Sequence, residues 1–293
     1  MPTDRSLDQL RAEIDAIDDR IHDLLMGRTE VVDRIGRKKR NRIRAGSALR
    51  PGREAIIIRR LVKRHRGRFP KSVIVRLWRE LLAAQVALQG PFSVAVFAPR
   101  GEDLYRDIAR DQFSSLTPLS QHATVNQVIQ SVSDGAASVG VLPMPFGEKP
   151  DSWWHGLIAE GAKVPRVIAR LPFAQTESIA AERGEALAIA CAELEPTGDD
   201  LSLVAVELAT EMSRDRLRDT LEDCGFTVGW IGSAADETEP RPAPYLVSIE
   251  GFVTKDDPRL NSIQSRPGPE VGRVLSIGGY ARPLTARDLA AES

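Results

Sequence analysis

The chain has 293 residues, of which 42% are hydrophobic and 28% are charged, a balance typical of a globular protein with two or three domains. This composition excludes a wholly disordered, collagenous or disulfide-stapled chain, and no run of 18 apolar residues predicts a membrane span. The polar start is unlike a signal peptide, and we expect Cys191 and Cys224 to be buried thiols, so a cytoplasmic location is favoured.

Charge is divided unevenly along the chain. Residues 1–90 carry 22 Lys and Arg against 11 Asp and Glu, whereas residues 91–293 carry 18 against 30. A basic half of this kind favours an anionic partner, although simple attraction between the two halves is the alternative.

The first predicted element is a helix from Ser6 to about Arg44. Apolar residues recur at the a and d positions of four heptads, which are Leu7, Leu10, Ile14, Ile17, Ile21, Leu24, Val31 and Ile35. A helix of about 39 residues would be about 58 Å long, at about 1.5 Å per residue. A rod of that length must pack against another helix or a second copy of the chain.

Arg28 breaks this heptad pattern, because it occupies an a position that should be apolar. A charged side chain in a packed seam is costly unless it is paired, so Arg28 either pairs with an acidic residue of a partner helix or lines an anion pocket. Lys39 lies about three turns further along the same face. Arg11 lies about 25 Å from Arg28 and on another face, so only an antiparallel partner copy could bring an Arg11 to this pocket.

Two further helices are predicted at Arg53–Arg66 and Lys71–Gln89, separated by Gly67 to Pro70. Arg53 and Glu54 open the first of them. Gln85 and Gln89 lie four residues apart on the second, whose inner face is otherwise apolar. Each of these residues alone could be a surface or helix-end residue, but the set of cations, one Glu and two Gln predicts a polar cavity in a helical core.

Beyond Gly90-Pro91 the pattern changes to short strands that alternate with helices, which predicts a parallel α/β lobe. The predicted strands here are 93–98, 137–142 and 164–171, and the predicted helices are 102–112, 124–133 and 152–160. From Leu201 the order β-α-β-β-α-β predicts a ferredoxin-like unit. The expected domains are therefore residues 1–90 (all-α), 91–198 (α/β) and 199–293 (ferredoxin-like α+β).

The N-terminal region resembles the all-helical chorismate mutase family. The resemblance covers residues 6–89 and is carried, in order, by residues 10–18, 24–28, 35–39, 50–54 and 87–89. It implies an intertwined homodimer of three-helix protomers that rearranges chorismate to prephenate in the pathway to aromatic amino acids. No cofactor and no metal are implied, since the reaction is a unimolecular [3,3] rearrangement.

The resemblance also implies roles for the polar residues. Arg11 of one protomer and Arg28 of the other would bind the two substrate carboxylates. Lys39 and Gln89 would hydrogen-bond the ether oxygen, where negative charge grows as the C–O bond breaks. Arg53 and Glu54 would complete the pocket, with Glu54 holding the substrate hydroxyl. Gln85 stands where the family has a serine, so its role in substrate binding stays open.

Residues 91–293 resemble a shortened prephenate dehydratase region followed by an ACT regulatory domain. The dehydratase Thr-Arg-Phe motif is missing from the sequence, and Pro145-Phe146 replaces an expected Glu-Asn. The phenylalanine-binding runs of the ACT domain are missing as well. We therefore expect a degenerate structural or ligand-sensing region, with a bifunctional mutase–dehydratase as the alternative.

A nucleic-acid-binding function is the competing hypothesis for the basic half, with Arg37 to Arg40 as its basic stripe. Residues 1–90 contain only two aromatic residues, Phe69 and Trp78, and such a function would leave Arg28 unexplained. We therefore expect neither nucleic acid nor membrane as a partner.

Overall fold

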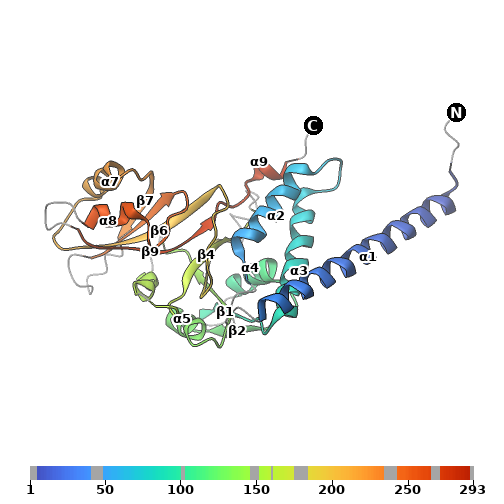
Figure 1. The fold of residues 1–293 in the computed structure, drawn as a ribbon, viewed down its shortest axis with the longest axis horizontal. Coiled ribbons are helices and arrows are strands. Elements are labelled where there is room, and N and C mark those ends of the chain that lie inside the picture. Colours follow the sequence, from blue (N-terminus) through green and yellow to red (C-terminus); the bar gives the residue numbers. More distant parts are fainter. Residues whose placement is uncertain are drawn as a thin grey trace.

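The computed structural model describes residues 5–40, 49–99, 103–145, 152–159, 161–174, 184–233, 243–264 and 271–290. Its helical N-terminal part consists of α1 (Leu7–Arg40), α2 (Pro51–Arg64) and α3 (Lys71–Gln89) (Figure 1). The first helix therefore has the start that the heptads predict, and its predicted end at Arg44 lies outside the described residues. Helix α2 begins at Pro51 rather than Arg53, because proline is well suited to the first position of a helix.

The α/β part confirms the predicted alternation and adds two strands. Its elements are β1 (Val94–Phe97), α4 (Leu104–Phe113), β2 (Leu119–His122), α5 (Val125–Ser133), β3 (Val139–Pro143), the 3-10 helix η2 (Ser152–Leu157), β4 (Arg166–Leu171) and β5 (Ala186–Ala190). Strands β2, β1 and β3 are parallel, as predicted, but β5 runs antiparallel between β3 and β4. The sheet is therefore mixed, and the predicted helix at 152–160 is a short 3-10 helix.

The last third of the described chain has the predicted β-α-β-β-α-β order. Its elements are β6 (Asp200–Leu208), α7 (Arg214–Asp223), β7 (Val228–Ser233), β8 (Tyr245–Glu250), α8 (Pro258–Gln264) and β9 (Val271–Ala281), followed by the short α9 (Ala286–Leu289). The strand order β9-β6-β8-β7 is antiparallel throughout, which is ferredoxin-like. Leu217 and Leu221 of α7 and Leu260 and Ile263 of α8 pack in one buried cluster with the strands.

A single nine-stranded sheet joins the two C-terminal parts, in the order β2-β1-β3-β5-β4-β9-β6-β8-β7. The junction is the pairing of Val167 in β4 with Gly278 in β9. A side chain at Gly278 would place its Cβ 2.3 Å from the Val167 carbonyl oxygen, and Gly278 has a φ of +124°. Only glycine fits such a close approach and such a backbone, so this position allows the two strands to meet.

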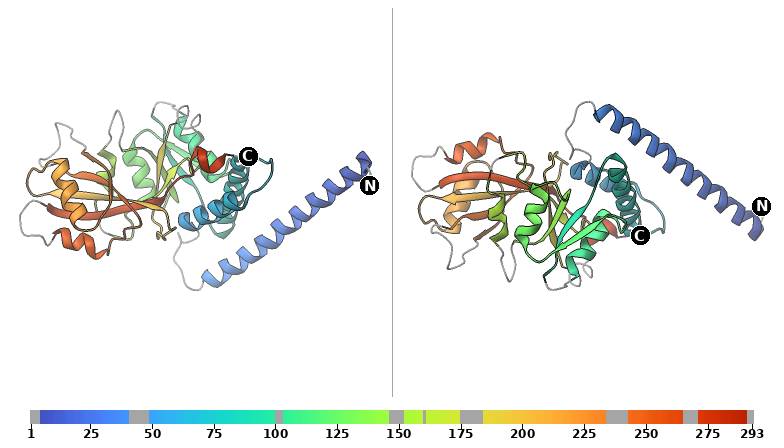
Figure 2. Two further views of the ribbon diagram at one scale, coloured as in Figure 1. Left: turned by 90° about the horizontal axis from the view of Figure 1, so that it is seen from above. Right: turned by 90° about the horizontal axis from the view of Figure 1, so that it is seen from below.

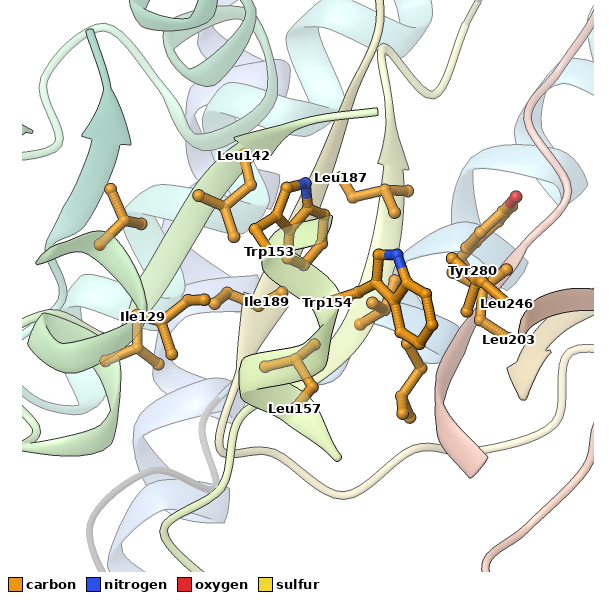
Figure 3. Close-up of a cluster of buried hydrophobic side chains, with 14 of the residues drawn as sticks. Ile129, Leu142, Trp153, Trp154, Leu157, Leu187, Ile189, Leu203, Leu246 and Tyr280 are labelled. Atoms are coloured by element: carbon orange, nitrogen blue, oxygen red, sulfur yellow. The ribbon is translucent and has the colours of Figure 1, made fainter. Parts of the chain in front are cut away.

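A buried cluster also crosses this junction (Figure 3). Trp154 of η2 is 1% exposed and belongs to the same cluster as Leu203 of β6, Leu246 of β8 and Tyr280 of β9. Both the sheet and this core therefore run across the boundary that the sequence predicts at residues 198–199.

Helices α2 and α3 pack against this sheet body, whereas α1 extends away from it (Figures 1 and 2). The inner faces of α2 and α3 form a cluster with Phe173 and Leu284, which lie after β4 and after β9. Arg59 of α2 strengthens the contact by donating to Thr197 Oγ1 at 2.9 Å and to the carbonyl oxygen of Arg282 at 2.7 Å.

Two sequence predictions concern the chain as a whole. No helix among the described residues has the length and apolar character to cross a membrane. Both cysteines are free thiols, but Cys191 is exposed and Cys224 is half-buried. The prediction of two buried thiols is therefore wrong: Cys191 follows directly on β5, at the point where the chain leaves the sheet.

Candidate active site between helices

Helix α1 presents its apolar heptad residues to solvent within one chain. Leu7 is 71% exposed and Leu24 is 73% exposed, and the other exposed members of the stripe are Leu10, Ile14, Ile17, Ile21, Val31 and Ile35. Apolar side chains repeated along one face of a helix are the signature of a helix-packing surface. The stripe is therefore present as predicted, and this chain alone leaves it uncovered.

The C-terminal half of α1 lies on α3. Gly36 of α1 faces Gln89 of α3, because a Cβ at Gly36 would lie 3.7 Å from Gln89 Cγ. Gln89 in turn donates from Nε2 to the carbonyl oxygen of Gln85 at 3.1 Å. The two glutamines predicted from their spacing are thus neighbours, and they lie on the helix that α1 contacts.

Three buried polar atoms on α1 and α3 have no hydrogen-bond partner among the described residues. They are Nη1 of Arg28, Nε2 of Gln85 and Nε of Arg79. Gln85 is 4% exposed, and burial lowers the pKa of the Arg28 guanidinium. Buried donors are nearly always hydrogen-bonded in native proteins, so each such donor marks a place where an acceptor is expected.

Glu54 has a different environment from the two glutamines. Its Oε2 accepts from Nη1 of Arg79 at 3.0 Å, and the side chains of Glu54 and Arg79 are 13% and 6% exposed. Burial raises the pKa of Glu54, and the nearby Arg79 charge and hydrogen bond oppose this effect. The pair lines a cavity of about 20 Å³ between α2, α3, α4 and β4, enough for about one water molecule.

The sequence analysis did not identify Arg79 as a site residue. A signal was available, since Arg79 follows Val75 by four residues and precedes Leu82 by three, on the buried stripe of α3. A charged residue on such a stripe is expected only where a partner is buried with it. That partner, Glu54, lies on another helix and is 25 residues away in sequence.

The remaining predicted residues lie apart within one chain. Arg11 is exposed near the free end of α1 and its Nη1 is 3.1 Å from Asp8 Oδ1. Arg53 is exposed on α2. Lys39 is the last residue but one of α1, and its side chain lies outside the described part of the structure. Their predicted roles in substrate binding stay predictions.

No group of three or more His, Cys, Asp or Glu side chains that could hold a metal ion occurs in the described part of the chain. The candidate site residues whose side chains the structure describes on α1, α2 and α3 are Arg, Gln and Glu. Side chains of these types hold an anionic organic ligand through hydrogen bonds and charge, with arginine well suited to carboxylates.

Comparison with known proteins assigns this helical region. Residues 10–90 match the family described as chorismate mutase type II. This part of the chain is a chorismate mutase domain. The matched range begins in the first third of α1 and ends one residue after α3, so it contains all seven predicted site residues.

Relatives that match this region are named for two activities, chorismate mutase and prephenate dehydratase. A bifunctional chorismate mutase/prephenate dehydratase of Pseudomonas aeruginosa is 28% identical over 141 residues, which is 47% of this chain and 38% of the relative. A protein of the same name from Neisseria gonorrhoeae is 33% identical over 91 residues, which is 31% of this chain and 24% of the relative. The matches thus span about two-fifths or less of the length of these relatives.

Solved structures resemble the chain only distantly. The crystal structure of a prephenate dehydratase from Streptococcus mutans aligns with a TM-score of 0.48 and 15% identity, over 66% of this chain and 98% of that one.

Proposed function

We propose that this protein catalyses the rearrangement of chorismate to prephenate as a chorismate mutase. The observation that carries the proposal is that two of the buried donors without partners among the described residues are Arg28 Nη1 and Gln85 Nε2, both within the region that matches the mutase family. A ligand with several negatively charged oxygen atoms would satisfy both donors. Chorismate is such a ligand, because it carries two carboxylates and an ether oxygen.

The proposed mechanism is catalysis by orientation and charge. Arg28 and the Arg11 of a partner subunit bind the two carboxylates, with Arg53 at the edge, and hold the substrate in a compressed, chair-like shape. Lys39 and Gln89 donate to the ether oxygen, whose negative charge grows in the transition state. Glu54 accepts a hydrogen bond from the substrate hydroxyl, and Gln85 donates from Nε2 to a substrate oxygen.

The proposal requires a homodimer with composite sites. In one chain the apolar stripe of α1 is exposed, and Arg11 lies about 25 Å along the helix from Arg28. An antiparallel second copy of α1 would cover the stripe and would bring its Arg11 towards Arg28. The same step would enclose the site and strengthen its electrostatic interactions.

The C-terminal region is assigned a structural or ligand-sensing role, with its ferredoxin-like part as an ACT-like unit. Only 14 residues lie between β4 and β5, which pair directly with each other, so there is little room for a second lobe at this point. A dehydratase needs a proton donor in a closed cleft. We therefore assign this protein to the mutase step of aromatic amino-acid biosynthesis, in the cytoplasm, and assign no dehydratase activity to its C-terminal region.

The test is an assay of chorismate absorbance with the purified full-length protein. We expect loss of chorismate, and we expect Lys39→Ala to lower kcat by about a hundredfold or more, because it removes a full charge from the ether oxygen. Lys38→Ala is the matched control, since Lys38 is an exposed neighbour on the same helix. Persistence of chorismate with the wild-type protein would refute the mutase proposal.

The same samples test the C-terminal assignment. Prephenate incubated with the wild-type protein at neutral pH should give no phenylpyruvate above the background without enzyme. Clear production of phenylpyruvate would show that the region is a working dehydratase and would replace the structural role proposed above.

A further inference from the structure

Arg79 is a buried cation in the mutase domain that none of the predicted roles uses. It lies on α3 with 5% of its surface exposed, and its Nη1 is 3.0 Å from Glu54 Oε2 on α2. A guanidinium removed from water is costly unless charge and hydrogen bonds compensate for it. Nε of Arg79 is buried without a hydrogen-bond partner among the described residues, so the contact of Nη1 with Glu54 is the charge contact that compensates for this burial.

Arg79 also contacts a residue of the sheet body. The guanidinium carbon of Arg79 lies 4.8 Å from the centre of the Phe173 ring, within range of a cation–π interaction. Phe173 is 4% exposed, and its carbonyl oxygen accepts from the Leu284 amide at 2.7 Å. Glu54 of the mutase domain is thus connected through Arg79 to a fixed aromatic ring after β4.

The pair is electrostatically isolated from other charges. Glu54 and Arg79 are the two ionisable residues in the lining of the cavity that they share, and the rest of that lining is apolar apart from Gln112. Charged residues on the surrounding elements have partners of their own, namely Arg59 with Asp199, Arg76 with Asp111, Arg170 with Glu185, Arg282 with Asp199 and Arg50 with Glu195. Arg53, beside Glu54 in the sequence, is exposed.

This isolation makes the charge of Glu54 depend on Arg79. Burial favours the protonated carboxyl and raises the pKa of Glu54, while Arg79 favours the carboxylate. A protonated carboxyl would be a poorer acceptor for a substrate hydroxyl than a carboxylate is. Removing Arg79 would leave burial unopposed, so the carboxyl would keep its proton to a higher pH.

We propose that Arg79 is a positioning residue of the mutase site, which holds Glu54 in one orientation and in its ionised form, and that Phe173 of the sheet body holds Arg79 in turn. This inference rests on the proposed mutase function and adds a residue to it. It also gives the sheet body a part in the mutase site, because the aromatic ring against Arg79 lies outside residues 1–90.

The experiment measures kcat and KM for chorismate as a function of pH with the full-length protein. The variants are Arg79→Met, Arg79→Lys, Glu54→Gln and the double variant of Arg79→Met with Glu54→Gln. Arg76→Met is the matched control, because Arg76 lies on the same helix with 72% of its side chain exposed. Circular dichroism establishes which variants are folded.

We expect Arg79→Met to lower kcat/KM at neutral pH by about tenfold and to move the acid limb of the pH profile upward by about one unit. Arg79→Lys keeps a charge beside Glu54, so its acid limb should stay close to that of the wild type. In the Glu54→Gln background Arg79→Met should cost nothing further, because the group that it positions is gone. Arg76→Met should match the wild type throughout.

The proposal is overturned if the acid limb of Arg79→Met stays where it is in the wild type. It is also overturned if Arg79→Met costs the same factor with and without Glu54, since the role would then be merely structural. Should Arg79→Met alone fail to fold, the comparison of Glu54→Gln with the double variant decides: equal rates support the proposal, and a further loss overturns it. An inactive wild-type protein would instead refute the proposed function itself.

Discussion

Helix α1 and the α2–α3 pair belong to one mutase domain but differ in how far their apolar side chains are buried within this chain. The apolar stripe of α1 is exposed along most of its length, with Ile14 58% exposed. One apolar face of α2 and α3 is buried against Phe173 and Leu284, and Ile58 of α2 is 0% exposed, whereas Leu77 and Leu88 of α3 are 52% and 59% exposed. The chain therefore covers one packing surface internally and leaves the other uncovered, so the same kind of substitution should have different effects on the two surfaces.

The largest effect is expected on the buried surface. Ile58→Asp places an unpaired charge in a fully buried apolar cluster, which should cost about 4 kcal/mol or more. A loss of that size is a large fraction of the total stability of a typical domain. We expect the variant to be largely insoluble or to melt far below the wild type, as measured by thermal circular dichroism. A variant that melts normally would mean that α2 does not pack on the sheet body.

The next effect concerns the exposed surface and changes assembly instead of folding. Ile14→Asp combined with Ile21→Asp should leave the thermal transition of the sheet body within about 0.5 kcal/mol of the wild type, because both side chains are solvent-exposed in one chain. The dimer should dissociate, and mutase activity should fall by about a hundredfold, because each site would lose the Arg11 of its partner.

Ala16→Asp is the control for this substitution. It adds one negative charge to α1, where the double variant adds two, at an exposed position outside the a and d stripe. Its mass in solution and its activity should match the wild type. If the double Ile variant stays dimeric and active, the stripe of α1 is not the subunit interface.

The elements with strong periodicity could be predicted from the sequence. Four heptads predicted α1, and the breaks at Gly67 to Pro70 and at Gly90-Pro91 predicted α3, expected from about Lys71 to Gln89 and observed at Lys71–Gln89. The order of strands and helices predicted the ferredoxin-like unit. Strands β2 and β5 were missed, because β2 (Leu-Ser-Gln-His) is a short, polar edge strand and β5 (Ala-Leu-Ala-Ile-Ala) is rich in alanine, which has a low strand propensity. Short strands owe their existence to pairing with distant segments, which local patterns do not record.

The candidate site shows the same division. Arg28, Gln85 and Gln89 could be selected because each is a polar residue on an apolar helix face. The partner of Glu54 could not be selected in this way, since Arg79 acquires its meaning from a contact across two helices and from Phe173. Similarly, the sheet continues across residues 198–199 through the pairing of Val167 with Gly278, together with an isolated bridge of Ala174 with Leu284, and no local sequence pattern indicates either contact.

The smallest expected effect is a difference in Tm between alanine substitutions at two helical glycines. A Cβ at Gly52 of α2 would lie 2.7 Å from the Glu195 carbonyl oxygen, whereas a Cβ at Gly27 of α1 would meet nothing within 4 Å. Gly52→Ala gains helix propensity but must displace a backbone segment, so we expect a net loss of about 1 kcal/mol, or about 2–4 °C in Tm. Gly27→Ala should leave the Tm of the sheet body unchanged. A Gly52→Ala protein as stable as the wild type would mean that the segment around Glu195 does not lie against α2, and the contrast between the two helices would then be confined to their apolar side chains.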